Sequence, residues 1–172
     1  PLMTTEDEEA LESESLPEIV PILPLRNTVL FPGVVIPITA GRDKSIKLIK
    51  DANATNKIIG VVPQQNEAIE NPNLEDIHKI GTVAQILRVL KMPDGNTTII
   101  IQGKKRFKIK TIIEEKPYMK ASIESIKESF SKKNDKKFTA TIDSIKDLAL
   151  QIINENPNIP SEASFAIKNI QT

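Results

Sequence analysis

Few residues in this chain have the chemistry that catalysis or metal binding requires. Its 172 residues include no Cys, and His78 is the only His. A disulfide, a thiolate nucleophile and a Cys-ligated metal site are therefore excluded. A zinc site or a Ser-His-Asp triad would have to be built around His78 alone. We expect His78 to be a surface or half-buried residue without a metal role.

Ser45 and Lys47 could in principle form a Ser-Lys dyad, because both residue types are present and lie close in sequence. Both are expected on the polar side of a helix, where solvated side chains are the simpler interpretation. The phosphate-loop patterns GxxxxGK[ST] and GxGxxG do not occur, and neither do GxSxG or HExxH. We therefore expect no catalytic, cofactor or metal site within this chain.

Residues 104–110 (KKRFKIK) are basic with one interleaved aromatic, a composition that could bind RNA. Charged and apolar residues alternate along the segment, which favours a strand with one solvated face. The chain has 23 basic and 23 acidic residues, so its net charge does not favour nucleic acid. No apolar run approaches the roughly 20 residues that cross a bilayer. We expect neither a membrane nor a nucleic-acid partner, with RNA binding as the alternative.

The first part of the chain divides by composition into a tail and an extended region. Residues 1–15 are acidic and polar and are predicted to be a disordered tail. Residues 16–38 are apolar but contain five prolines, which exclude a helix and favour short strands with edge character. We predict strands at about 19–23 and 34–38, with a tight turn at Phe31-Pro32-Gly33.

Local patterns predict the next elements. Residues 43–54 have helical spacing, with Asp43 as a plausible N-cap. Residues 57–63 form a short apolar strand, and a polar connection follows. The strand at 80–91 is expected to place Val83 and Val89 on one face.

A hairpin turn is predicted at residues 92–96 (MPDGN) because Pro, Asp and Gly favour turns. The chain returns over residues 97–102, and Gly103 is expected to mark a bulge or bend. Further alternating strands are predicted at 106–113 and 118–126.

The pattern becomes helical near Ser129. Residues 138–153 have an apolar stripe at helical spacing, and a further helix is predicted over 161–170. We predict an α+β chain with a disordered tail at 1–15, a β-domain at 16–128 and a truncated helical unit at 129–172. Because numbering starts at Pro1 and the second unit is short, we expect a fragment of a longer chain.

Several motifs together resemble the amino-terminal domain of Lon proteases. Residues 23–33 (LPLRNTVLFPG) and 34–38 (VVIPI) resemble its opening signature, and Gly41-Arg42 with Ser45 follows. Residues 81–84 are similar to the family's GTVA strand, 93–95 to its hairpin tip, and 103–106 to its G-x-x-R element. These matches keep the family's order and spacing over about residues 16–126. One departure is His78, where the family often has an aromatic residue.

The resemblance implies a fold and a parent enzyme. The fold would be a PUA-like, partly open β-barrel of about six strands with short helices, followed by a helical bundle. The parent would be a bacterial cytoplasmic or organellar homohexamer that uses ATP and Mg to unfold proteins and cleaves them with a Ser-Lys dyad. This chain would be its non-catalytic amino-terminal part. Its partners would be unfolded or damaged protein substrates and the other subunits of the hexamer.

Two groups of residues are candidates for the site. The first group could form an exposed apolar patch for unfolded chains, or it could belong to the barrel core: Leu30, Phe31, Val34 and Val35. The second group comprises the family's motif positions: Pro24, Leu25, Arg26, Pro32, Gly33, Arg42, Gly81, Pro93, Asp94, Gly95, Gly103 and Arg106. For its three arginines, hydrogen bonds that tie strand ends together are favoured over contact with substrate or a neighbouring subunit.

Overall fold

The computed structural model describes residues 16–126, 136–156, 158–160 and 162–168. The described residues fall into two compact units, one within Pro1–Lys127 and one within Glu128–Thr172. The predicted acidic tail at 1–15 lies outside the described residues. The elements in chain order are β1 (Ile19–Leu25), β2 (Val35–Ala40), α2 (Asp43–Ala54), β3 (Ile58–Pro63), a 3₁₀ turn (Leu74–Asp76), β4 (Ile80–Lys91), β5 (Thr97–Glu114), β6 (Lys120–Ser125), α3 (Lys136–Glu155) and α4 (Glu162–Lys168).

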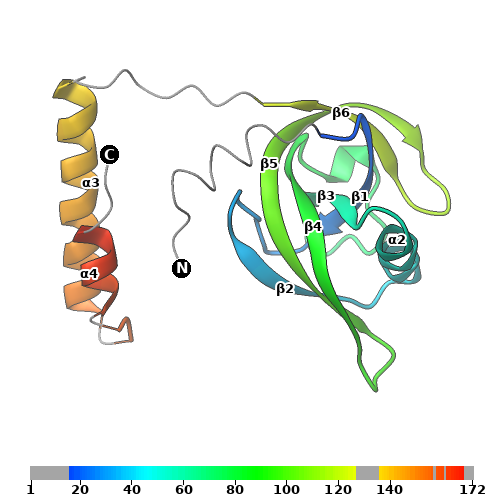
Figure 1. The fold of residues 1–172 in the computed structure, drawn as a ribbon, viewed down its shortest axis with the longest axis horizontal. Helices are drawn as coiled ribbons and strands as arrows, with labels where there is room; N and C mark the ends of the chain where they lie inside the picture. Colours follow the sequence, from blue (N-terminus) through cyan, green and yellow to red (C-terminus); the bar gives the residue numbers. More distant parts are fainter. Residues whose placement is uncertain (1–15, 127–135, 157, 161, 169–172) are drawn as a thin grey trace. The chain divides into compact units, whose positions relative to one another are not determined.

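The strands of the first unit form one mixed sheet that curls into a partly open barrel (Figure 1). Its order is β2-β5-β4-β3-β1-β6, and β6 also pairs with β5. β1 and β3 are parallel, whereas the other pairs are antiparallel. Within the described residues β2 pairs with β5 alone, so its other edge is free. The predicted fold class, a partly open barrel of six strands, is confirmed.

β1 tolerates two prolines because its two halves pair on different sides. Ile19, Val20 and Pro21 pair with β6, and the residues from Ile22 to Leu25 pair with β3. Each half therefore keeps one side without a paired strand, where a missing N–H removes no ladder hydrogen bond. β1 lies between β3 and β6 in the sheet, so the predicted edge character applies only to one side of each half. β1 also runs two residues beyond the predicted 19–23.

β5 corrects the prediction of two separate return strands. It runs unbroken from Thr97 to Glu114. The register shifts between the pairs Val83–Lys105 and Ala84–Gly103, so Lys104 is one extra residue on β5. The bulge expected at Gly103 is therefore confirmed, but it bends the strand instead of ending it.

A second bulge corrects the predicted faces of β4. The pairing with β5 passes from Ile86 to Arg88 and leaves Leu87 as an extra residue. Because one extra residue inverts the alternation, Val89 packs on the same cluster as Ile86 and not with Val83. Leu87 itself is exposed.

α2 spans Asp43–Ala54, the residues predicted, but its N-cap is Arg42 and not Asp43. Arg42 is extended and its carbonyl accepts the N–H of Ile46, whereas its side chain makes no cap. Asp43 lies in the first turn, where a carboxylate favours the positive end of the helix dipole. The buried residues of α2 are Ser45, Leu48, Ile49 and Ala52.

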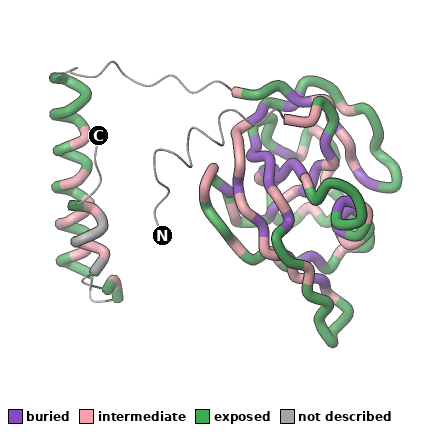
Figure 2. Tube along the Cα trace, in the orientation of Figure 1, coloured by how far each residue is buried: buried purple, intermediate pink, exposed green. Residues whose placement is uncertain are grey.

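The barrel holds two hydrophobic clusters. Neighbours in one strand, such as Val61 and Val62 or Val83 and Ala84, belong to different clusters because successive side chains point to opposite faces. One cluster takes in Leu48 and other residues of α2. Figure 2 shows the buried residues running along the strands and the inner side of α2.

The second unit consists of α3 and α4. α3 is longer than the predicted 138–153. α4 lies within the predicted 161–170, whose remaining residues are outside the described ones. No residue of α3 is buried, and Ile145, Leu148 and Ile152 of its apolar stripe are 56%, 60% and 60% exposed. Among the helices that the structure describes, none is long and apolar enough to span a membrane.

One side-chain contact ties α2 to the start of β6. The hydroxyl of Tyr118, which is the only Tyr of the chain, donates to Oδ2 of Asp51 at 3.0 Å. Burial and this hydrogen bond raise the pKa of Tyr118 above its usual 10.0. The native state therefore holds the phenol proton more tightly than the unfolded state does.

Tyr118→Phe should lower the unfolding free energy by about 1 kcal/mol at neutral pH, because the hydrogen bond to Asp51 is lost. In the unaltered chain, the contribution of Tyr118 to stability is fully present below about pH 10. It is lost as the pH rises through the raised pKa of Tyr118. The variant should therefore show a shallower alkaline decline. Urea unfolding at a series of alkaline pH values measures both effects, and parallel declines of the two proteins would contradict this role.

Candidate functional site

A tight turn at residues 31–34, called the 31–34 turn below, presents the first candidate surface. The N–H of Val34 donates to the carbonyl of Phe31 at 3.2 Å. Gly33 has φ 76°, the positive value that a type II turn requires at its third position. Pro32 precedes it, where its fixed φ suits the second position. The predicted turn is confirmed.

The segment that carries this turn is anchored to the barrel at three points. Leu30 is buried, and its carbonyl accepts the hydroxyl of Thr82 at 2.6 Å. The N–H of Gly33 donates to the carbonyl of Gly103, and the N–H of Gly103 donates to the carbonyl of Val34, both at 2.9 Å. These bonds hold the turn against the bend in β5.

The four predicted apolar residues do not all lie on the surface. Leu30 is only 3% exposed, so it is corrected to a core residue. Phe31, Val34 and Val35 are 59%, 44% and 49% exposed. Leu30 is therefore in the core and Phe31 is in solvent, and the hydroxyl of Thr82 holds the backbone at Leu30.

Sequence reasoning missed two members of this surface. Val29 and Ile80 are 55% and 45% exposed, and with Phe31 they line a hollow of about 70 Å³. Val29 could have been found from its position two residues before Phe31. Ile80 comes from a distant strand and carries no local signal. The apolar surface is defined here as Val29, Phe31, Val34 and Ile80.

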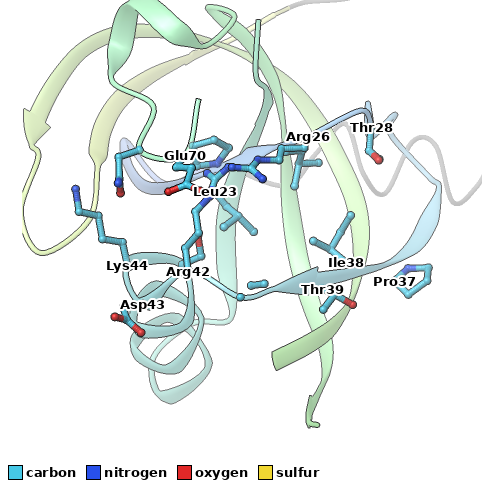
Figure 3. A pocket seen from close by; sticks show the side chains of 16 residues that line it. Leu23, Arg26, Thr28, Pro37, Ile38, Thr39, Arg42, Asp43, Lys44 and Glu70 are labelled. Atoms are coloured by element: carbon cyan, nitrogen blue, oxygen red, sulfur yellow. The ribbon is translucent and has the colours of Figure 1, made fainter. Parts of the chain in front are cut away.

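A second candidate site is a cavity of about 810 Å³ at the opening of the barrel (Figure 3). One wall is the end of β1 with Leu23, Leu25 and Arg26, and another is the free-edge strand β2. The beginning of α2 and the loop at Glu70 complete the lining. The cavity therefore lies between two strands that do not pair with each other.

Arg26 and Arg42 meet in this cavity. The Nη2 atoms of both donate to the carbonyl of Ile69, at 3.3 and 3.5 Å, and Arg42 also donates to Oε1 of Gln64 at 3.1 Å. Burial and then the charge of Arg26 lower the pKa of Arg42, and Glu70 raises it. The hydrogen bonds fit the expected role of tying chain segments together.

The remaining motif positions serve the barrel. Gly95 has φ 88° in the predicted hairpin turn, which also contains Pro93. The side chain of Asp94 accepts the N–H of Asn96. The N–H of Gly95 donates to the carbonyl of Met92. Gly81 lies so close to β3 that an added Cβ would be 2.3 Å from the carbonyl of Val61.

The basic segment of β5 has one solvated face. Phe107 and Ile109 are buried, and Lys108 and Lys110 are exposed. Lys108 lies opposite Glu124 of β6, so an acidic neighbour offsets part of its charge. Arg106 lines the hollow beside Phe31.

The residues with catalytic potential are not brought together. Ser45 is buried, which corrects its predicted solvated position, and Lys47 pairs with Asp51 at 3.6 Å. His78 is exposed. Within the part of the chain that the structure describes, no group of three or more His, Asp or Glu side chains could hold a metal. What the described surfaces present is exposed apolar side chains and guanidinium donors.

Gly103→Ala should lower the unfolding free energy by about 2 kcal/mol, because the added Cβ would lie 2.2 Å from the carbonyl oxygen of Phe31. The backbone of Phe31 cannot move away from the added Cβ unless the 31–34 turn moves with it. Gly41→Ala is the control, since its Cβ meets the far end of the Asn96 side chain at 2.6 Å and no backbone atom. Urea unfolding compares the two variants, and equal stabilities would refute the anchoring role of Gly103.

The chain matches a known family over nearly its whole described length. The model of the ATP-dependent protease La (LON) substrate-binding domain matches residues 19–172. A Lon protease of Flavobacterium johnsoniae is 68% identical over 172 residues, which are 100% of this chain and 21% of that protein. A Lon protease of Cytophaga hutchinsonii is 48% identical with the same coverage. The chain thus spans about a fifth of the length of these relatives.

Solved structures share the fold. The N-terminal domain of a Mycobacterium avium complex Lon protease superposes with a TM-score of 0.69 at 21% identity, over 88% of this chain and 75% of that one. A Lon N-terminal domain protein from Xanthomonas campestris has a TM-score of 0.57 at 16% identity, over 77% and 73%. From the family model and the identities, the chain belongs to the family of Lon substrate-binding domains.

Proposed function

We propose that this chain captures unfolded or damaged protein substrates for a Lon-type protease through the apolar surface at the 31–34 turn. The parent would be an ATP-dependent serine endopeptidase with a Ser-Lys dyad and ATP and Mg sites outside this chain. It would act as a homohexamer in the bacterial cytoplasm. Membership in the substrate-binding family supports the proposal, as does the exposure of Phe31 on an anchored turn.

The apolar surface suits sequence-tolerant binding. Phe31 and Val29 are more than half exposed, although a folded protein ordinarily buries such side chains. The bonds at Gly33 and Gly103 hold the turn in place before any ligand arrives, so little ordering entropy is lost on binding. Unfolded proteins expose apolar side chains that native proteins hide. One copy would bind weakly, and six copies in a ring would add avidity.

Phe31→Ser should weaken binding of an unfolded model protein about fivefold, since roughly 1 kcal/mol of apolar burial is lost. NMR titration with a permanently unfolded protein measures this affinity. Ile113→Ser is the matched control, because Ile113 is 51% exposed and lies ten residues beyond Gly103 on β5. If both variants bound the unfolded protein as tightly as the unaltered chain does, the apolar surface would be ruled out as the binding site.

A second role, support of the hexamer, rests on the apolar stripe of α3. Ile145, Leu148 and Ile152 are all more than half exposed within the described residues. An amphipathic helix gains stability when such a stripe packs on another element. We propose that the stripe contacts further parts of the parent protease.

Leu148→Glu in the full-length protease should lower the fraction of hexamer, because a charge would be placed in a packed apolar contact. Light scattering coupled to size exclusion measures the fraction. Asn154→Glu adds the same charge outside the stripe and should leave assembly unchanged. A hexamer unaffected by Leu148→Glu would count against the assembly role.

A further inference from the structure

The cavity between β1 and β2 combines two features that the proposed capture of apolar segments does not use. Its accessible apolar lining consists of Pro24, Pro37 and Ile38. Its rim is cationic, with the guanidinium groups of Arg26 and Arg42 (Figure 3). Its volume of about 810 Å³ accommodates a terminal residue with several preceding atoms.

The two guanidinium groups converge on one acceptor. Both donate to the carbonyl oxygen of Ile69, which also accepts from Nε2 of Gln64 at 2.6 Å. A guanidinium has five N–H donors, and these bonds use only Nη2 of each arginine. The described residues give the other N–H groups of Arg26 and Arg42 no acceptor. The pair is therefore positioned by protein contacts and still has donors to offer.

The positive charge of this pair is only partly offset by Glu70, which lines the same cavity. Neither guanidinium forms an ion pair with any described acidic group, although Glu70 is near enough to raise the pKa of Arg42. Asp43 points away from the arginines in Figure 3. Two cations held side by side repel each other, and an anion between them would relieve that repulsion. A carboxylate matches the planar fork of a guanidinium.

The strand edges that flank the cavity limit other modes of binding. Pro24 of β1 and Pro37 of β2 line it, and neither has an N–H to donate to an added strand. Pairing of a long peptide along these edges would therefore be incomplete. Recognition in the cavity would depend on its charged rim and apolar lining instead.

We propose that the cavity binds the C-terminal residue of a protein chain, with its α-carboxylate on Arg26 and Arg42 and its apolar side chain against Pro24, Pro37 and Ile38. The inference rests on the proposed capture of substrates and adds a second, end-specific contact to it. A substrate would then be held at the apolar surface by its interior segments and at the cavity by its free end.

Matched peptides test the proposal with the unaltered 172-residue chain. A short fluorescent peptide ending in Leu with a free carboxylate should bind at least about tenfold more tightly than the same peptide with a C-terminal amide. A third peptide ending in Ser should bind more weakly than the Leu peptide, because the apolar contact is lost. Fluorescence anisotropy measures all three, and equal affinities of acid and amide overturn the proposal.

A variant locates the contact. Arg26→Gln should reduce the ratio of the affinities for the free-acid and amide peptides to about one, because one of the two guanidinium groups is removed. Arg26 is exposed and makes a single hydrogen bond, so the fold should tolerate the change better than it tolerates loss of Arg42. Arg88→Gln, an exposed arginine on β4, removes the same charge elsewhere and should preserve the preference. Loss of the preference in both variants would indicate general charge attraction and overturn the assignment.

The outcome is separable from the proposed function. Phe31→Ser should weaken binding of an unfolded protein and leave the acid-to-amide ratio of the short peptides unchanged. If the peptides show no end preference while Phe31→Ser still weakens the unfolded protein, only the cavity proposal fails. If the end preference is present and Phe31→Ser has no effect, the apolar surface fails instead.

Discussion

β5 can pair with β2, β4 and β6 because it bends where Lys104 adds one residue to the strand. At that bend Gly103 has no side chain, so the backbone of Phe31 can approach it closely. The same glycine exchanges hydrogen bonds with Gly33 and Val34. The closure of the barrel and the position of the 31–34 turn thus depend on one local contact. Without this approach, the 31–34 turn would lose two of the three contacts that anchor it to the barrel.

That connection presents two kinds of chemistry. Arg26 is at its beginning, beside the cavity, and Phe31 is further along, beside the hollow at Ile80. Leu30 anchors the segment between the two sites in the core. Apolar and anionic groups of one ligand could therefore be engaged by a single short segment. Because both sites are held by the barrel, binding would require little rearrangement of the domain.

The prolines of β1 and β2 have a structural and a protective effect. They lie where the strands have an unpaired side, so the missing N–H groups leave the sheet intact. They also make the free edges poor templates for pairing with another copy of the chain. Strand pairing between copies would compete with the ligand binding that we propose for the exposed apolar turn.

The sequence by itself determined the elements whose signals are local: the helix at 43–54, the turns at Gly33 and Gly95, and the motifs of the family. Neighbouring residues carry those signals, and no distant partner is needed to produce them. Only the tertiary structure decided that Leu30 is buried beside the exposed Phe31, that the bulge at Leu87 inverts β4, and that Ile80 joins the apolar surface. It also decided that Arg26 and Arg42 share the carbonyl of Ile69. These outcomes come from contacts between residues far apart in the chain, and periodicity along one segment cannot encode them.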